Sequence, residues 1–367
     1  MSRQIAVIGL GLIGGSIAMG LKEFEDFKRV GVDVSQPTLR YALEQGIVDQ
    51  VCEDPQEALA QADLVFLCMH PRGIQEFLSE HRDHFRPGSL VTDVCGVKGA
   101  IVDAARTLPS SVSFLGGHPM AGTEFSGIQH ALPNMFQGAH YILTPDEGTQ
   151  PEHLALMERV ARHLGCADVV RTTPEQHDAI IAYTSQMMHI IAVSVCDDPS
   201  LFAYQGFEGD SFRGCTRVAA LDVPLWTQLF SLNAPALLTA LDRLEENLHA
   251  YREAIASGDT KLLSEKLAYS AARKREMDLP GPGREALLER FRRSNEEAGR
   301  EMDIHRQKAE ELRAGCRQLK EQLASLAAEK LELERRRTQQ NQEMQRCNEE
   351  VLHTEREVAR LEQQKNA

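Results

Sequence analysis

An apolar run that leads directly into a glycine-rich loop is the feature that most constrains how this chain can fold. Residues 5–8 read IAVI, and residues 9–16 read GLGLIGGS. A strand followed by Gly-x-Gly-x-x-Gly and a helix is typical of a nucleotide-binding α/β domain. The loop alone is weak support for binding, because glycines also form tight turns that hold no ligand.

The residues around this loop favour a dinucleotide. Gly9 would allow the tight turn, Gly11 would let the backbone approach a pyrophosphate, and Gly14 would let the helix pack on the strand. Asp33, at the end of the second apolar run, VGVDV, could bind both ribose hydroxyls and would repel a 2′-phosphate, although Arg40 leaves NADP open. We therefore expect NAD as cofactor. The predicted binding residues are Gly9, Gly11, Leu12, Ile13, Gly14 and Asp33.

Apolar runs alternate with helical patterns up to about residue 171. The nearly continuous apolar run at 64–69, LVFLCM, indicates a parallel sheet covered on both faces. The predicted strands are 4–8, 29–34, 64–69, 89–94, 112–116, 140–144 and 168–171, with helices at 13–23, 38–45, 73–80 and 98–107 among those between them. We expect a Rossmann-type doubly wound dinucleotide-binding domain over residues 1–171.

The next region, residues 172–279, has helical patterns. Residues 177–195, HDAIIAYTSQMMHIIAVSV, are apolar around much of a helix circumference, which suits a helix buried in a core or at a subunit interface. Residues 234–255 are amphipathic. The sequence predicts an all-helical substrate and dimerisation domain here.

The break PGPG at 280–283 precedes a change of pattern. From Leu288 to Leu361 most a and d positions of a seven-residue repeat are apolar, which predicts a linker plus a C-terminal coiled coil over residues 280–367. Lys330, Arg337 and Gln340 interrupt the seam, so its middle should be weak. A single solvated helix is the alternative. The sequence does not identify the partner of this coiled coil, and a second copy of the same chain is one candidate.

Composition excludes several classes of protein. The net charge is −14, which argues against nucleic acid as the main partner, while a local Arg or His cluster could still bind a small anion. Eight cysteines without a C-x-x-C pair predict a reduced cytoplasmic protein with no metal site. We see no run of about 18 apolar residues and no secretory pattern, so we expect no membrane span.

Three further groups of residues could carry chemistry. His118 follows the predicted strand 112–116, where a neutral imidazole could accept a hydroxyl proton, although a lone histidine is often structural. Asp93 and Lys98 could position the cofactor or nearby loops, or could cap a helix. Arg217 could clamp a carboxylate or form a surface ion pair.

Six ordered motifs across residues 1–279 resemble the prephenate/arogenate dehydrogenase family of tyrosine biosynthesis. They are GLGLIGGS, TDVCGVK at 92–98, HPMAGTEFSG at 118–127, GAHYILTP at 138–145, the segment 177–189, and FRGCTRVAALDVPLW at 212–226. The resemblance implies NAD-dependent oxidative decarboxylation of prephenate to 4-hydroxyphenylpyruvate, with arogenate, which would give tyrosine, as the alternative substrate.

The resemblance also implies residue roles. His118 would take the hydroxyl proton, Arg217 would bind a substrate carboxylate, and the helical domain would form a homodimer. The other expected substrate contacts are Thr123, Ser185, Gln186, His189 and Trp226, the last reaching across a dimer interface.

The sequence departs from the family pattern in places. Gly96 stands where many members have Ser, Gln186 stands where many have His, and the tail lacks the regulatory ACT domain of some relatives. A β-hydroxyacid dehydrogenase would need a Lys that residues 174–200 do not contain. A non-catalytic NAD-binding scaffold would not need His118 and Arg217.

Overall fold

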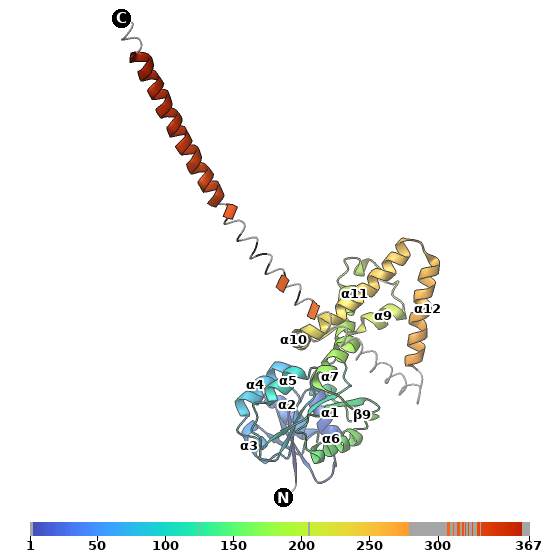
Figure 1. Ribbon diagram of the computed structural model, residues 1–367. Coiled ribbons are helices and arrows are strands. Elements are labelled where there is room, and N and C mark those ends of the chain that lie inside the picture. Colours follow the sequence, from blue (N-terminus) through green and yellow to red (C-terminus); the bar gives the residue numbers. More distant parts are fainter. Residues whose placement is uncertain are drawn as a thin grey trace. The chain divides into compact units, whose positions relative to one another are not determined.

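The computed structural model describes residues 3–123, 125–204, 206–278 and 332–361, with scattered positions between 307 and 330. The chain divides into two compact units, residues 1–253 and residues 254–367. The first unit holds the sheets and the site discussed below (Figure 1).

A six-stranded parallel sheet forms the centre of the first unit, in the order β3-β2-β1-β4-β5-β6. Its strands are β1 (Gln4–Ile8), β2 (Lys28–Val32), β3 (Gln50–Cys52), β4 (Leu64–Leu67), β5 (Leu90–Asp93) and β6 (Ser113–Phe114). Helices α1 (Leu12–Gly20), α2 (Gln36–Glu44), α3 (Pro55–Gln61), α4 (Pro71–His81) and α5 (Gly99–Ala105) connect them. This strand order confirms the predicted doubly wound domain.

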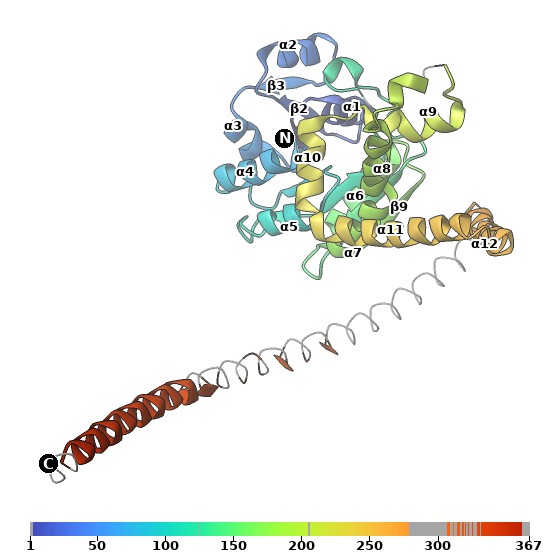
Figure 2. The same ribbon diagram turned by 90° about the horizontal axis from the view of Figure 1, so that it is seen from above.

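The two faces of this sheet bury separate apolar clusters. Alternate residues of β1 point to opposite faces: Ile5 and Val7 enter one cluster, and Ala6 and Ile8 enter the other. The sheet is therefore covered by helices on both sides, as Figure 2 shows from above. Strand β3 was not predicted, because it is only 3 residues long and partly exposed.

A second, three-stranded sheet changes the position of the predicted catalytic histidine. In it β7 (Gly116–Pro119) runs antiparallel to β8 (His140–Thr144), and β8 is parallel to β9 (Asp168–Arg171). The predicted strand 112–116 is therefore wrong as a single element, and His118 lies within β7 instead of in a loop after a strand. Ser113 and Phe114 pair with β5, whereas Gly116–Pro119 pair with β8, so the run is divided between two sheets.

Helices follow the second sheet. They are α7 (Pro174–Ile181), the π-helical turn η2 (Ala182–Gln186), α8 (Met187–Cys196), the 3-10 turn η3 (Leu201–Tyr204), α9 (Asp210–Thr216), the 3-10 turn η4 (Arg217–Ala219), α10 (Val223–Leu232) and α11 (Ala234–Ala256). The remaining elements of this unit are the 3-10 turn η1 (Ile128–His130) and α6 (Pro151–His163). Thr173 begins α7 by accepting the N–H of Gln176, and Asp222 begins α10 by accepting the N–H of Leu225.

The predicted apolar helix over 177–195 exists, with the π-helical turn inside it. Among the described residues, Pro174–Cys196 is long and apolar enough to span a membrane by length and composition alone, and the expectation of no membrane span stays a prediction. Only 28% of its most apolar window is buried inside the chain. Exposed apolar side chains such as Tyr183 and Val195 leave this helix with a face that other protein can cover.

In the second unit, α12 (Thr260–Met277) begins at Asp259, whose carboxylate accepts the N–H of Leu262. Residues 332–361 are helical and exposed. The PGPG break and the predicted coiled coil up to residue 306 lie outside the described residues.

Candidate functional site

The glycine loop between β1 and α1 is shaped by close backbone packing. Gly9 has a φ of +91°, and a Cβ added there would lie 2.6 Å from the Cys68 carbonyl oxygen. A Cβ added at Gly14 would lie 1.9 Å from the Gly9 carbonyl oxygen, whereas at Gly11 nothing lies within 4 Å. Gly9 and Gly14 are therefore required by the fold, and Gly11 leaves open space above the loop.

The start of α1 can hold an anion. Its first residue after Gly11 is Leu12, and no side chain caps this end and no acidic residue lies in the first turn. The carboxylate of Asp33 closes the loop by accepting the N–H of Leu10 and the N–H of Ser35, both at 2.8 Å. Backbone N–H groups at a helix start and a carboxylate beside them fit the pyrophosphate and the ribose of a dinucleotide.

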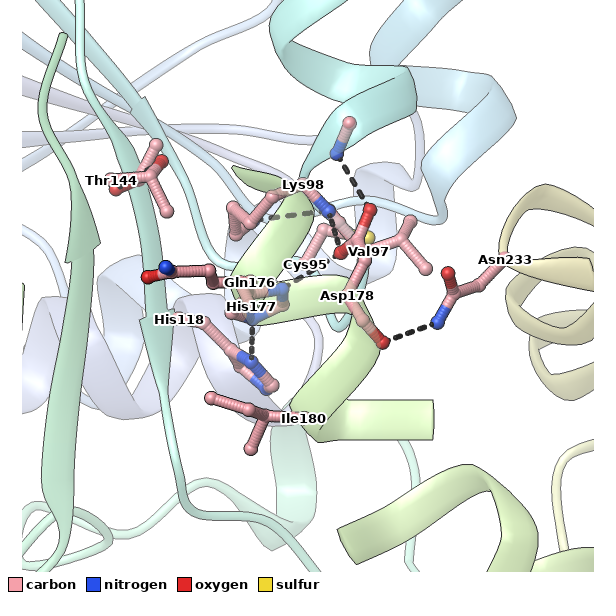
Figure 3. A network of polar contacts seen from close by, with 12 residues as sticks. Cys95, Val97, Lys98, His118, Thr144, Gln176, His177, Asp178, Ile180 and Asn233 are labelled. Atoms are coloured by element: carbon pink, nitrogen blue, oxygen red, sulfur yellow. Dashed lines mark hydrogen bonds and ion pairs between the residues drawn. The ribbon is translucent and has the colours of Figure 1, made fainter. Parts of the chain in front are cut away.

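A chain of three side chains links β7 to α7 (Figure 3). The Nδ1 atom of His118 lies 2.9 Å from Nε2 of His177, and Nδ1 of His177 lies 2.8 Å from Oδ1 of Asp178. Asp178 also accepts the N–H of Lys98 at 2.7 Å and the N–H of Gly99 at 2.8 Å. Its carboxylate therefore caps α5 and orients His177 at the same time.

The hydrogen bonds assign the protons on these rings. Because the Asp178 carboxylate only accepts, Nδ1 of His177 carries a proton and Nε2 of His177 is an acceptor. Nδ1 of His118 then donates to His177. This leaves Nε2 of His118 with a free lone pair, which is what a general base requires.

The pKa of each histidine supports the neutral form. Burial lowers the pKa of His118 well below its usual value, and electrostatic interactions with His177 and Lys98 lower this pKa further. Burial also lowers the pKa of His177, which the hydrogen bond to Asp178 opposes. Both rings are therefore neutral near pH 7, so His118 can accept a proton.

A buried ion pair supports the same region. Lys98 and Asp93 pair with both side chains fully buried, and Asp93 also accepts the N–H groups of Cys95 at 2.9 Å and Gly117 at 3.2 Å. Asp93 and Lys98 were predicted either to position the cofactor or nearby loops, or to cap a helix. The structure shows that they position neighbouring loops. The pair joins the end of β5 to β7, beside His118.

A second group of predicted site residues meets around α8. The ring of His189 stacks on Trp226 at 3.5 Å between centroids, and its Nδ1 atom lies 2.9 Å from the Ser185 carbonyl oxygen. Burial lowers the pKa of His189, and the charge of Arg217 lowers it further. Trp226 thus reaches His189 of its own chain, so this contact does not require a dimer. Ser185 lies in the π-helical turn, a feature frequent at functional sites.

Helix α10 connects the two groups, lying between α4 and α8 (Figure 2). Leu229, one turn beyond Trp226, packs near Gly96. A Cβ added at Gly96 would lie 3.5 Å from Leu229 Cδ2 and 3.9 Å from His118 Cε1. Gly96 therefore borders the His118 ring and leaves room for a small side chain.

Gln186 is buried in the wall of the site. Its Nε2 donates to the Leu229 carbonyl oxygen at 3.4 Å, and its Oε1 accepts Nδ2 of Asn233 at 2.8 Å. Asn233 also donates to the Asp178 carbonyl oxygen at 2.9 Å. The Gln186 amide thus ties the π-helical turn η2 to α10 and, through Asn233, to the end of the His118 chain.

Thr123 lies in the exposed segment after β7, where its hydroxyl accepts the N–H of Phe125 at 3.4 Å. Sequence reasoning assigned no role to His177, Asp178 or Asn233. The adjacent letters HD at 177–178 were quoted in a motif, but no spacing rule links them to His118, 59 residues away. Only the folding of α7 against β7 brings these residues together.

Comparisons with known proteins agree with this architecture. Residues 17–170 match the family model of the prephenate dehydrogenase nucleotide-binding domain, and residues 173–269 match that of the prephenate dehydrogenase dimerization domain. The chain is 33% identical to the cyclohexadienyl dehydrogenase of Zymomonas mobilis, over 72% of this chain and 92% of that protein. It is 30% identical to the prephenate dehydrogenase of Bacillus subtilis, over 72% and 73%.

Solved structures are similar as well. Prephenate dehydrogenase from Aquifex aeolicus, in complex with hydroxyphenyl propionate and NAD+, superposes with a TM-score of 0.68 at 28% identity, over 76% of this chain and 99% of that chain. Arogenate dehydrogenase from Synechocystis has a TM-score of 0.66 at 32% identity, over 75% and 99%. The glycine loop, the His118 chain, both domain matches and these relatives together show that the protein belongs to the prephenate/arogenate dehydrogenase family.

Proposed function

We propose that this chain is an NAD-dependent prephenate dehydrogenase that forms 4-hydroxyphenylpyruvate in tyrosine biosynthesis. The observation that carries the proposal is the chain from His118 through His177 to Asp178, which leaves a basic nitrogen of His118 free. A dehydrogenase that oxidises a ring alcohol needs such a base.

The glycine loop and Asp33 would hold NAD, as their geometry fits its pyrophosphate and ribose. When bound, NAD supplies the acceptor for the hydride that leaves the hydroxyl-bearing ring carbon. Leu12 and Ile13 would contribute backbone N–H groups at the start of α1. The proposal includes no metal.

Proton transfer falls to His118. Its Nε2 would take the proton of the ring hydroxyl as the carbon–hydrogen bond breaks and the carbonyl forms. The imidazolium that results would be stabilised by His177, whose own proton faces the Asp178 carboxylate. Loss of the ring carboxylate as CO₂ then makes the ring aromatic, which drives the reaction forward.

The second group of residues would bind the rest of the substrate. Arg217 would pair with a substrate carboxylate, because a guanidinium forms two parallel hydrogen bonds with one. His189 would offer its free Nε2, and Trp226 would hold that ring in place. The remaining proposed contacts are Thr123, Ser185 and Gln186, the last acting as a buried support of the wall.

Arogenate is the second candidate substrate, giving tyrosine directly. It differs from prephenate by an amino group in place of the side-chain keto group. A relative titled arogenate dehydrogenase is 32% identical, so family membership does not separate the two.

We further propose a cytoplasmic homodimer built through the helical domain. The match to a dimerization domain over 173–269 and the exposed apolar side chains of α8 support the homodimer. The cysteines that the structure describes are free thiols, which supports a reducing compartment. The proposed domain boundaries are 1–171, 172–279 and 280–367.

Initial rates of NAD reduction test the proposal, measured with prephenate and with arogenate, and in parallel with NADP. We expect the highest kcat/KM with prephenate and NAD. Higher kcat/KM with arogenate would assign the second substrate. NAD binding without turnover of either substrate would contradict an enzymatic role and favour the scaffold.

A further inference from the structure

Asn233 lies at the junction of α10 and α11 and is only 4% exposed. Its N–H donates to the Leu229 carbonyl oxygen at 3.2 Å, which ends α10. Its carbonyl oxygen accepts the N–H of Leu237 at 3.0 Å, which begins the hydrogen bonding of α11. The two helices therefore pair the backbone of this residue. Because the side-chain amide is buried as well, it needs partners inside the protein.

The side-chain amide of Asn233 has two such partners. Nδ2 donates to the Asp178 carbonyl oxygen at 2.9 Å and to Oε1 of Gln186 at 2.8 Å. Asp178 lies in α7, ahead of the π-helical turn η2, and Gln186 is the last residue of that turn. One amide at the end of α10 therefore holds the chain on both sides of the place where α7 and α8 depart from regular α-helix.

Backbone carbonyls fix the direction in which these amides face. A carbonyl oxygen only accepts, so the Asp178 oxygen requires the Nδ2 atom of Asn233. Gln186 must then turn its Oε1 atom toward Asn233, which directs its Nε2 atom to the Leu229 carbonyl oxygen at 3.4 Å. Each contact agrees with the others, so these four residues have a single hydrogen-bonded arrangement.

The two partners of this amide belong to the two groups of site residues. Asp178 ends the hydrogen-bond chain that orients His118, and Figure 3 shows the amide donating to the Asp178 carbonyl oxygen. Gln186 follows Ser185, whose carbonyl oxygen lies 2.9 Å from the ring nitrogen Nδ1 of His189. The amide therefore links the proposed base to the residues that we propose to bind substrate.

We propose that Asn233 is a positioning residue, which sets the place of the π-helical turn η2 relative to His118 for the reaction proposed above. Without the amide, the Asp178 carbonyl oxygen and Oε1 of Gln186 would lose the donor that they share, and a buried acceptor left without a donor favours movement of its element. A displacement of about 1 Å can cost about 100-fold in rate, even when the substituted residue lies away from the reacting atoms.

Steady-state kinetics distinguish this role from the role of a group that acts on one step. Loss of a group that acts on the base alone should change kcat, and loss of a group that binds substrate alone should change KM. Asn233→Ala disturbs both groups. We therefore expect kcat to fall and KM for prephenate to rise, with kcat/KM lower by about 10- to 100-fold and NAD affinity unchanged.

Ser231→Ala is the matched control for this measurement. Ser231 is exposed on the same helix, and its hydroxyl donates to the Thr227 carbonyl oxygen within α10 at 2.6 Å. We expect this variant to keep kcat and KM within about twofold of the unsubstituted enzyme. A folded Asn233→Ala variant with the same small effect as Ser231→Ala would overturn the proposal.

A double-mutant cycle tests the link between Asn233 and Gln186. Gln186→Met keeps the length of the side chain and removes its hydrogen bonds. If Asn233 acts through Gln186, the double variant should lose no more kcat/KM than the worse single variant, whereas additive losses would overturn the link. Should Asn233→Ala fail to fold, Gln186→Met alone decides, because it must show the same joint change of kcat and KM.

Fluorescence tests the position of the wall without turnover. Trp226 is the only tryptophan of the chain, and it lies on α10, which Asn233 ends. We expect Asn233→Ala to raise the acrylamide quenching constant of Trp226 and Ser231→Ala to leave it unchanged. An unchanged constant in Asn233→Ala would overturn the positioning role. Failure of the unsubstituted chain to oxidise prephenate or arogenate would instead contradict the proposed function, and the quenching result would still decide whether Asn233 positions the wall.

Discussion

The imidazoles of His118 and His177 lie 2.9 Å apart, nitrogen to nitrogen, although the residues come from different elements, β7 and α7. The contact fixes the ring of His118 through Nδ1 and leaves Nε2 as the nitrogen that could accept a proton. Asp178 completes the arrangement and also caps α5. One carboxylate therefore couples the position of the proposed base, His118, to the packing of the nucleotide-binding domain.

This coupling predicts a positioning role for His177. His177→Phe removes the acceptor for Nδ1 of His118, so we expect kcat to fall at least about tenfold with KM and NAD affinity unchanged. His177→Gln should recover part of the loss, because its amide oxygen can accept the same hydrogen bond. Equal kcat values for the Phe and Gln variants would assign His177 to packing alone.

The lowered pKa values predict how activity and stability depend on pH. Because burial lowers the pKa of His118, the base stays neutral below its usual titration range, and the acid limb of kcat/KM should lie below about pH 6.5.

The unfolded chain binds protons at His118 and His177 more readily than the folded chain. Stability from these two groups is therefore present above about pH 6.5 and is lost as pH falls below it. Thermal unfolding at pH 5.5 and pH 7.5 measures this loss of stability. An equal Tm at the two pH values would contradict the prediction.

Substitutions at Gly96 and Gly14 should have opposite outcomes. A Cβ at Gly96 meets only ordinary contacts, so Gly96→Ala should leave folding intact and Gly96→Ser should remain active, with its hydroxyl beside the His118 ring. A Cβ at Gly14 would overlap the Gly9 carbonyl oxygen, so Gly14→Ala should abolish NAD binding or folding. Circular dichroism, fluorescence titration with NAD and initial rates separate these cases. Loss of fold in Gly96→Ala would contradict the described packing.

Arg217 and Arg213 form a matched pair for the carboxylate clamp. Both lie in the exposed segment that includes α9 and η4, but the charge of Arg217 acts on His189. Arg217→Ala should raise KM about 10- to 100-fold, as expected for a lost charge-assisted hydrogen bond, with a smaller effect on kcat. Arg213→Ala is the control and should leave KM within about twofold. An unchanged KM in Arg217→Ala would contradict the assignment of Arg217 as the group that binds the substrate carboxylate.

How much of this was predictable from sequence differs between the fold and the site. The doubly wound domain and most of its strands followed from the glycine loop and from runs such as LVFLCM, because buried parallel strands have a strong apolar signal. The short strand β3 and the break between β6 and β7 lacked that apolar signal. The position of β7 depends instead on contacts with Asp93 and Thr144. His118 was recognised from its motif. Its partners His177 and Asp178 depend on long-range packing, which no local pattern encodes.

We expect the preference for NAD over NADP to depend on Asp33. Asp33→Ser keeps an oxygen for the N–H groups of Leu10 and Ser35 but removes the negative charge that repels a 2′-phosphate. The ratio of kcat/KM for NAD to that for NADP should fall by at least about tenfold. An unchanged ratio would exclude Asp33 from the ribose site.

The central claim is that His118 is the base, and one measurement tests it most directly. Single-turnover reduction of NAD with prephenate should be about 10²–10⁴-fold slower in His118→Asn than in the unsubstituted enzyme, because the amide cannot take the hydroxyl proton. NAD affinity, measured by fluorescence titration of the same samples, should be unchanged. A rate within a factor of a few of the unsubstituted enzyme would contradict the assignment of His118 as the base.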